Sequence, residues 1–253
     1  MDTIAIIPAR GGSKGLHRKN ILPLLGHPLI AYSIIAAKLA QSISRIIVST
    51  DCPEIAAISR KYGAEVPFLR PSEFSTDSST DREFLLHAVQ WFAKYEGFRP
   101  EYLVHLRPTT PLRDPLLINQ AVKQIKNSTV ATSLRSAHLA MKTPYKWFEM
   151  DSEGFFKGIR PHDVRPEYFN LPRQSFAAVY DPNGYVDVVR SSQLLSSQSL
   201  HGHSMMGFVT EHTHDIDSSA DFEFLDYWVR RNGSMLLPYL QKLANPEIEK
   251  KNE

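Results

Sequence analysis

Short apolar runs alternate with amphipathic stretches along the first half of the chain. Apolar runs bounded by turn-forming or charged residues predict buried strands, and apolar residues spaced three and four positions apart predict helices. The predicted strands of this half are 4–8, 44–50, 65–69, 102–106 and 129–133. The predicted helices are 28–40, 54–62, 81–95 and 116–125. This alternation predicts an α/β fold: a Rossmann-like, mostly parallel sheet with helices on both faces.

The alternation stops near Ser136 and resumes after Pro182. The residues between are rich in proline and aromatic side chains and show no clear period, which predicts an insertion over 137–182 in a single domain spanning 1–253. Two further strands, a final helix and a charged tail follow. The strands are expected at 185–189 and 205–210, the helix at 220–231, and a disordered tail at 245–253.

Composition narrows the class of protein. A chain of 253 residues is long enough to bury a substantial core as one large α/β domain. The net charge of +2 and the absence of a Lys/Arg block give no support to nucleic-acid binding. The single cysteine, Cys52, excludes an internal disulfide framework. No apolar run reaches transmembrane length or resembles a signal peptide, so we expect a cytoplasmic protein without a membrane partner.

The first predicted strand opens into a glycine-rich, cationic loop. It reads Ala9-Arg10-Gly11-Gly12-Ser13-Lys14-Gly15, and Lys19-Asn20 follows. Glycines let the backbone approach anionic oxygens, and cationic side chains add charge-assisted hydrogen bonds. The order matches neither a Walker A loop nor the Gly-x-Gly-x-x-Gly of dinucleotide binders. The loop therefore predicts a polyphosphate site, with an exposed basic turn as the alternative.

The segment from Ile6 to Asn20 resembles the signature of the CMP-sialic acid synthetases, or acylneuraminate cytidylyltransferases, which include relatives that activate legionaminic and pseudaminic acids. The resemblance implies the nucleotide-diphospho-sugar transferase type of fold. It also implies transfer of CMP from CTP to a nonulosonic, sialic-acid-like 2-keto sugar acid, release of pyrophosphate, and use of Mg²⁺ (or Mn²⁺). It assigns catalytic handling of the triphosphate to Arg10, Lys14 and Lys19. The wider nucleotide site that it implies is Ala9, Gly11, Gly12, Ser13 and Asn20.

Two later segments extend the resemblance to the base and the sugar. Arg70, in Leu69–Glu73, matches an arginine that helps to read cytosine, and Ser79 and Asp81 follow where the family lines the base pocket. Residues 106–113 resemble the family's Leu-Gln-Pro-Thr-Ser-Pro-Leu-Arg, which implies acceptor binding by Thr109 and Thr110. Arg107 stands where the family has a glutamine that contacts sugar hydroxyls.

The insertion and its end complete the implied acceptor site. Lys142 lies near a family lysine, and Arg173 matches an arginine that reaches the sugar site of the partner subunit, which implies a homodimer. Asn183 also matches, but Asp187 stands where the family has a sugar-contacting tyrosine. The exchanges at 107 and 187 favour a modified nonulosonate or a related 3-deoxy sugar acid. Asp187 is expected either to accept hydrogen bonds from that sugar or to pair with Arg107.

Two carboxylates, Asp215 and Asp217, precede the last predicted helix. At i and i+2 of an extended segment they point to the same side, which suits Mg²⁺ together with substrate phosphates. Asp217 or Ser218 as a helix cap is the alternative. The segment resembles the family's metal motif, which implies that Asp215 and Asp217 bind the metal and that Asp221 either begins the helix or supports the metal ligands from behind. His201, His203, His212 and His214 fit no zinc spacing and are interpreted as strand and loop residues.

The sequence leaves three alternatives to CMP transfer open. A relative of the same fold that uses another nucleoside triphosphate or a sugar phosphate is the first. A catalytically silent nucleotide-binding protein is the second. A dinucleotide-dependent oxidoreductase is the third, and the glycine spacing disfavours it.

Overall fold

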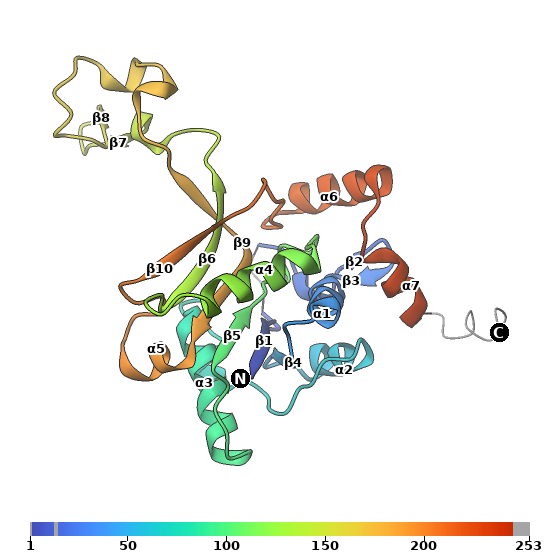
Figure 1. Cartoon of the computed structure of the whole chain (residues 1–253). Helices are drawn as coiled ribbons and strands as arrows, with labels where there is room; N and C mark the ends of the chain where they lie inside the picture. Colours follow the sequence, from blue (N-terminus) through green and yellow to red (C-terminus); the bar gives the residue numbers. More distant parts are fainter. Residues whose placement is uncertain (1, 13–14, 245–253) are drawn as a thin grey trace.

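The computed structural model describes residues 2–12 and 15–244, and its centre is a six-stranded sheet in the order β10-β6-β9-β5-β1-β4 (Figure 1). The strands are β1 (Thr3–Pro8), β4 (Arg45–Ser49), β5 (Tyr102–His105), β6 (Ser133–Leu139), β9 (Tyr180–Arg190) and β10 (Met205–Val209). β1 pairs in parallel with β4 and β5, and β10 pairs in parallel with β6. β9 runs antiparallel, between β5 and β6. The mostly parallel sheet predicted from the sequence is confirmed.

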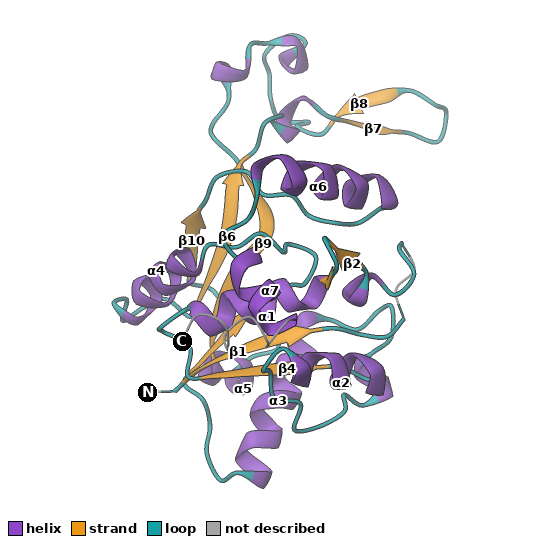
Figure 2. Ribbon diagram, turned by 90° about the vertical axis from the view of Figure 1, so that its right-hand side faces the viewer, coloured by secondary structure: helices purple, strands orange, loops and turns teal. Residues whose placement is uncertain are grey.

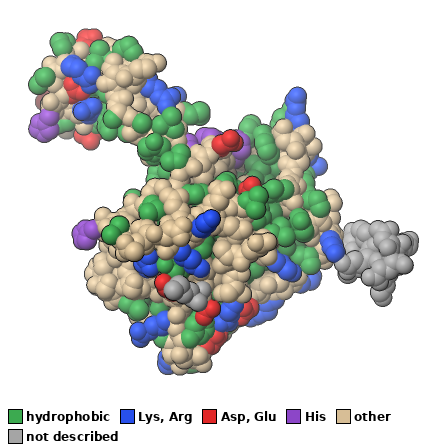
Figure 3. Space-filling view, viewed as in Figure 1, with side chains coloured by type: hydrophobic (Ala, Val, Ile, Leu, Met, Phe, Trp, Pro, Cys, Tyr) green, Lys and Arg blue, Asp and Glu red, His purple; other side chains and the backbone are tan. Residues whose placement is uncertain are grey.

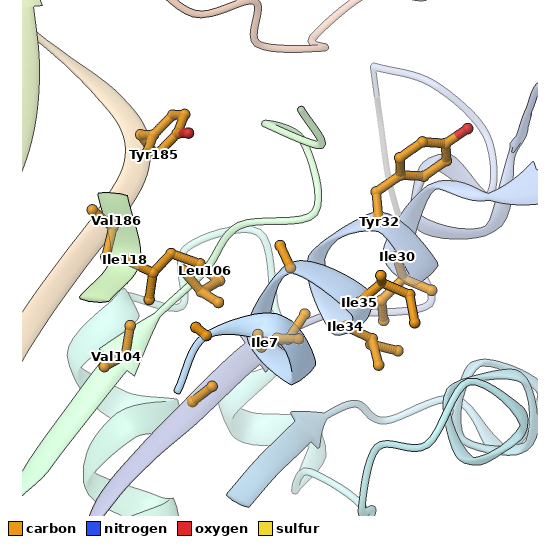
Figure 4. Close-up of a cluster of buried hydrophobic side chains, with 14 of the residues drawn as sticks. Ile7, Ile30, Tyr32, Ile34, Ile35, Val104, Leu106, Ile118, Tyr185 and Val186 are labelled. Atoms are coloured by element: carbon orange, nitrogen blue, oxygen red, sulfur yellow. The ribbon is translucent and has the colours of Figure 1, made fainter. Parts of the chain in front are cut away.

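Helices cover both faces of the sheet because successive β1 side chains point to opposite faces. Ala5 and Ile7 join a core cluster that includes α1 (Leu29–Leu39) and α4 (Pro115–Lys126). Ile4 and Ile6 join a second cluster with α3 (Asp81–Tyr95). Figure 2 shows the two helical layers, and Figure 4 shows Ile7 among the apolar side chains of the first cluster.

Each of the remaining helices adds at least one buried side chain to one of these two core clusters. They are α2 (Pro53–Lys61), α5 (Ser191–Ser196), α6 (Ser219–Asn232) and α7 (Leu237–Ala244). The sequence did not predict α5 or α7, whereas α3 has the predicted bounds because a Thr80–Glu83 capping box fixes where it begins. A small hairpin of β2 (Pro23–Leu24) and β3 (His27–Pro28) precedes α1. No helix in the described part of the chain is long and apolar enough to cross a membrane.

Three strand predictions need correction. The strand expected at 65–69 is a single bridge between Glu65 and Ile47, because Pro67 has no N–H with which to continue a ladder. The strand expected at 129–133 is wrong in its bounds: the strand of this region, β6, begins only at Ser133 and runs to Leu139. It pairs on both sides, with β10 and β9. The strand expected at 185–189 is the middle of the longer β9.

The segment 140–179, called here the arm, leaves the sheet between β6 and β9. The outer ends of these strands form a two-stranded ribbon, with Leu139 opposite Tyr180, that carries the arm away from the sheet (Figure 1). The arm contains the hairpin β7 (Phe148–Met150) and β8 (Phe156–Gly158) and three 3₁₀ turns, at Pro144–Lys146, Tyr168–Asn170 and Arg173–Ser175. Figure 3 shows hydrophobic side chains on its surface, and those with more than half of their area exposed include Trp147, Phe155, Phe156 and Val164.

Candidate active site

A cavity of about 290 Å³ lies at the edge of the sheet where β1, β4 and β5 end. Parallel strands bring their carboxyl ends to one edge, so the loops that follow them meet there. From the predicted nucleotide site, the cavity is lined by Arg10, Lys19, Asn20, Arg70, Ser79 and Asp81. Arg107 and Thr109, from the predicted acceptor site, line it too. Segments far apart in the sequence therefore share one cavity.

The glycine-rich loop is fastened to the sheet from two sides. The N–H of Gly11 donates to Oδ1 of Asp51 at 2.8 Å, and Nδ2 of the buried Asn20 donates to the carbonyl of Arg10 at 3.0 Å. Ala9 is buried and continues β1, its N–H donating to the Ser49 carbonyl. A Cβ added to Gly12 would meet nothing within 4 Å, and Ser13 and Lys14 lie outside the described residues. Asp51 holds the loop, a role that the sequence did not assign to it.

Arg10 lies at the mouth of the cavity and is engaged by the loop before α3. Its Nη1 donates to the Thr76 carbonyl at 2.9 Å and to Oδ1 of Asp77 at 2.8 Å. The arginine side chain is about one third exposed. A partly exposed guanidinium of this kind can exchange these acceptors for phosphate oxygens, which supports the predicted role of Arg10.

Lys19 connects the loop to the carboxylate segment before α6. Its Nζ donates to the Ile216 carbonyl at 2.8 Å and lies 3.3 Å from Oδ1 of Asp217. The same segment is fixed to the cavity wall because the N–H of Ile216 donates to the Thr109 carbonyl at 3.0 Å. The structure therefore places Asp217 beside a cation of the predicted triphosphate site.

Of the two residues in the capping alternative, Ser218 caps α6 and Asp217 does not. Ser218 is the N-cap of α6, and Oδ2 of Asp221 accepts from the backbone N–H of Ser218 in a capping box. Asp215 and Asp217 are both exposed on either side of the fully buried Ile216, as expected for neighbours on one side of an extended segment. Oδ1 of Asp215 lies 3.5 Å from Oγ1 of Thr110.

Gly15 allows the glycine-rich loop to lie close to the backbone of Asp217. A Cβ added to Gly15 would lie 2.7 Å from the Asp217 carbonyl oxygen, closer than real Cβ contacts. We therefore expect Gly15→Ala to push the carboxylate segment away and to reduce kcat/KM by about tenfold, because small misplacements of reacting groups are costly. Steady-state kinetics checks this. Gly207→Ala on β10, where an added Cβ meets nothing within 4 Å, is the control and should leave kcat/KM unchanged.

Arg70 forms part of the cavity floor. Its Nε donates to Oγ of Ser49 at 3.0 Å, its Nη2 donates to the Ser49 carbonyl, and its guanidinium lies over the Phe84 ring. Burial lowers the pKa of Arg70 to about 10. Most of its donors therefore hold β4 and the cavity floor together, and one face remains at the cavity.

Arg107 is held between two carboxylates. Its Nη2 donates to Oδ2 of Asp81 at 2.6 Å, and its Nη1 donates to Oδ2 of Asp187 at 3.0 Å. Asp187 is almost fully buried, so of the two expectations for it the structure shows pairing with Arg107. The fully buried His105 lies beneath, with Nδ1 3.9 Å from both carboxylates, and burial lowers its pKa to about 4. No role was predicted for His105 from the sequence.

Thr110 and Asn183 are buried and form hydrogen bonds with backbone groups of β9 near the cavity. Oγ1 of Thr110 donates to the Asn183 carbonyl at 3.3 Å, and Oδ1 of Asn183 accepts from the N–H of Tyr185 at 3.2 Å. Gly184 lies where the pairing of β9 with β6 shifts register, and its φ of 62° suits a residue without a Cβ. Arg113, which the sequence did not single out, donates to the carbonyls of Tyr185 and Gly184. Thr110 and Asn183 therefore shape the site without lining the cavity.

Lys142 and Arg173 lie on the arm and do not line the cavity of their own chain. Nη1 and Nη2 of Arg173 donate to the carbonyls of Met141 and Ala140, at the base of the arm. None of the four histidines lines this cavity. Among the described residues no three His, Cys, Asp or Glu side chains are grouped as metal ligands.

Comparison with known proteins agrees with this geometry. A family model described as cytidylyltransferase matches residues 4–199. The chain is 32% identical over 252 residues to the N-acylneuraminate cytidylyltransferase of Escherichia coli O18:K1:H7, covering 99% of this chain and 57% of that longer protein. It is 30% identical to the CMP-N,N'-diacetyllegionaminic acid synthase of Legionella pneumophila, covering 94% of this chain and 100% of that protein.

A solved structure shares the fold. The structure of CMP:2-keto-3-deoxy-manno-octonic acid synthetase complexed with CTP superposes with a TM-score of 0.68, covering 91% of this chain and 99% of that chain. At 15% identity this likeness concerns the fold alone. The family model over residues 4–199 and the relatives over nearly the whole chain show that the chain belongs to the cytidylyltransferase family.

Proposed function

We propose that this protein transfers CMP from CTP to the anomeric hydroxyl of a nonulosonic, sialic-acid-like 2-keto-3-deoxy sugar acid and releases pyrophosphate. The observation that carries the proposal is the contact of Lys19, from the phosphate loop, with Asp217, from the carboxylate segment, beside the cavity. Cations for a polyphosphate and carboxylates for a metal are thereby brought to one place. The names of the two relatives, which refer to acylneuraminate and legionaminic acid, support this acceptor class.

The chemistry is an in-line displacement at the α-phosphorus. The anomeric oxygen forms a bond to that phosphorus, the α–β phosphoanhydride bond breaks, and the hydroxyl proton is released. Such a reaction needs positioning and charge stabilisation more than covalent work by the protein. In this proposal Arg10 and Lys19, which line the cavity, bind the phosphates and stabilise the departing pyrophosphate, and Asp51 holds the loop through the N–H of Gly11.

Asp215 and Asp217 are the proposed Mg²⁺ ligands. The donor set fits this ion, because Mg²⁺ takes one or two carboxylates together with substrate phosphates and water. When bound, the metal neutralises phosphate charge and polarises the α-phosphate. Lys19 holds the carboxylate segment in register with the loop through the Ile216 carbonyl.

We expect Asp217→Ala to raise the Mg²⁺ concentration needed for half-maximal activity by about tenfold, because one of two protein ligands is lost. A Mg²⁺ titration of turnover at fixed CTP checks this. The control is Asp226→Ala, which removes a carboxylate that pairs with Arg230 within α6; it is expected to cost less than about 1 kcal/mol of folding stability without moving the metal titration. Equal metal titrations for wild type and Asp217→Ala would contradict the metal assignment.

We further propose a homodimer in which the arm of one protomer reaches the cavity of the other. The exposed aromatic side chains of the arm support an interface there. Lys142 and Arg173 do not line the cavity of their own chain, which is consistent with a role in the acceptor site of a partner. Light scattering should give twice the mass of one chain.

Subunit mixing tests this arrangement directly. Arg10→Ala chains lack the phosphate arginine and Arg173→Ala chains lack the arm arginine, so each is expected to be weakly active alone. A mixture at equal amounts should recover about a quarter of wild-type activity, because half of the dimers then contain one intact site. No recovery would show that Arg173 does not serve a partner's site.

The main test of the proposed function is pyrophosphate release from CTP, UTP, GTP and ATP across a panel of 2-keto sugar acids. Release with CTP and a nonulosonic acid is the expected result. Release with a different triphosphate would assign another nucleotidyl transfer, and nucleotide binding without release under any condition would favour a silent nucleotide-binding protein.

A further inference from the structure

Among the described residues, four cationic side chains line the cavity, and each already has acceptors within the chain. Arg70 donates to the Ser49 carbonyl, and Arg107 is held between two carboxylates. Lys19 donates to the Ile216 carbonyl. A polyphosphate that binds here must therefore take hydrogen bonds away from acceptors of the protein itself. The strength of these internal contacts sets part of the affinity of the site for anions.

Arg10, the fourth cation, has the acceptors that are easiest to replace. Its Nη1 donates to Oδ1 of Asp77 at 2.8 Å and to the Thr76 carbonyl at 2.9 Å, and both of these residues line the cavity. The side chain of Asp77 is 47% exposed, whereas that of Asp187, beside Arg107, is 2% exposed. An exposed ion pair is worth little, and breaking a buried one is costly. A phosphate can therefore displace Asp77 from Arg10 at small cost.

The carboxylate of Asp77 opposes a bound polyphosphate in two ways. It occupies a donor of Arg10 that a phosphate oxygen needs, and once displaced it remains at the cavity as a negative charge near other negative charges. The Thr76 carbonyl, which is uncharged, has only the first effect. This combination predicts that Asp77 lowers the affinity of the site for the triphosphate substrate and for pyrophosphate alike.

The loop that carries Asp77 is held together by hydrogen bonds of its own. Oγ of Ser79 accepts from the N–H of Thr76 at 2.9 Å and donates to the Glu73 carbonyl at 3.2 Å. These hydrogen bonds do not involve Arg10, so the loop keeps its shape when the guanidinium turns to a phosphate. Asp77 then stays within reach and can recover Arg10 when the anion leaves.

We infer that Asp77 is an internal competitor for Arg10: its carboxylate takes the guanidinium back as pyrophosphate departs, and so prevents this product from remaining bound. The same competition costs some affinity for the triphosphate, which brings further contacts of its own with the site. The inference rests on the proposed release of pyrophosphate beside Arg10. It gives Asp77 a role in product release rather than in the chemistry at the α-phosphorus.

Calorimetric titration with inorganic pyrophosphate in the presence of Mg²⁺, without any acceptor, tests the inference. Asp77→Asn keeps the size of the side chain but removes its charge. It should bind pyrophosphate about three- to tenfold more tightly than wild type, the effect of one partly exposed charge beside the ligand. In turnover assays, correspondingly less pyrophosphate should inhibit this variant. Asp77→Glu, which keeps the carboxylate, should bind pyrophosphate within about twofold of wild type.

Glu73→Gln is the matched control, because Glu73 is an exposed carboxylate of the same loop that does not line the cavity. It should leave the affinity for pyrophosphate unchanged. A purely structural role of Asp77 predicts the opposite sign, since loss of a structural contact loosens the site. Weaker or unchanged binding of pyrophosphate by Asp77→Asn would therefore overturn the inference.

A double-mutant cycle shows whether Asp77 acts through Arg10. The tightening caused by Asp77→Asn should shrink in an Arg10→Ala background, and equal tightening with and without Arg10 would reduce Asp77 to a general charge effect. If Asp77→Asn fails to fold by circular dichroism, Asp77→Ser decides in the same titrations. Tighter pyrophosphate binding by the variant, without transfer to any sugar acid by wild type, would defeat the proposed function and leave the competition for Arg10 standing.

Discussion

Arg10→Ala is expected to lower kcat/KM by about 10²- to 10³-fold, the loss typical when one donor to a developing anionic charge is removed. Arg10 follows β1 directly and lies at the cavity mouth, where its Nη1 contacts acceptors that phosphate oxygens can replace. Since its side chain is partly exposed and contributes little to the core, the folding stability should change by less than about 1 kcal/mol. Steady-state kinetics and thermal melting measure the two effects.

Arg18→Ala is the matched control for this experiment. Arg18 belongs to the same cationic stretch, but its guanidinium pairs with Glu54 on α2 and it does not line the cavity. Its replacement should change kcat/KM by less than about twofold, as expected for an exposed ion pair. Equal losses in the two variants would mean that the loop acts through overall charge, and wild-type kinetics for Arg10→Ala would remove Arg10 from the active site.

Arg113→Met is expected to lower the free energy of unfolding by about 3 kcal/mol, because several buried carbonyls would lose their donor at once. Arg113 is 1% exposed, and burial lowers the pKa of its guanidinium to about 9. It donates to Oγ of Ser33 at 2.8 Å, to the Arg107 carbonyl at 2.6 Å and to the Gly184 carbonyl at 2.9 Å. One side chain thus joins α1, the loop after β5 and the irregular part of β9 at Gly184.

Urea denaturation measures this loss. An unchanged slope of the unfolding free energy against urea concentration would show that the folded state is intact. The control is Arg60→Met, since Arg60 donates to one carbonyl, that of Val66, near the surface. It should cost less than about 1 kcal/mol. Because Arg113 also supports the backbone of Arg107, its loss should lower activity even where the protein remains folded. A stability equal to wild type would show that water replaces the guanidinium.

The sequence predicted the parts of the fold whose signals are local. Helix α3 has the predicted bounds because its capping residues and apolar spacing all lie within one segment. The strand predicted at 65–69 was wrong because Pro67 outweighs the apolar character of its neighbours. Helix α7 was missed although its apolar residues Leu237 and Leu240 meet the core, because contact with α1 stabilises it.

The candidate site divides in the same way. Arg10, Lys19, Asn20 and Arg70 were identified from the sequence and do line the cavity. Asp51, Asp77 and His105 were not identified, since a single acidic residue or histidine at the end of a strand or in a loop is common in any α/β protein. Asp187 was expected to meet the sugar or Arg107, and only the antiparallel course of β9 brings it beneath Arg107.

The sequence by itself determined the class of chemistry, because the glycines and cationic residues of the loop after the first strand are neighbours in the chain. Their order can be recognised as a phosphate site without knowledge of the fold. Only the tertiary structure decided which distant groups act together. Lys19 meets Asp217 across 198 positions, and Arg107 meets Asp187 across 80. The physical reason is that the packing of the whole sheet fixes the order of its strands, and this order decides which loops and strand residues meet at one edge. No local pattern in the chain records that order.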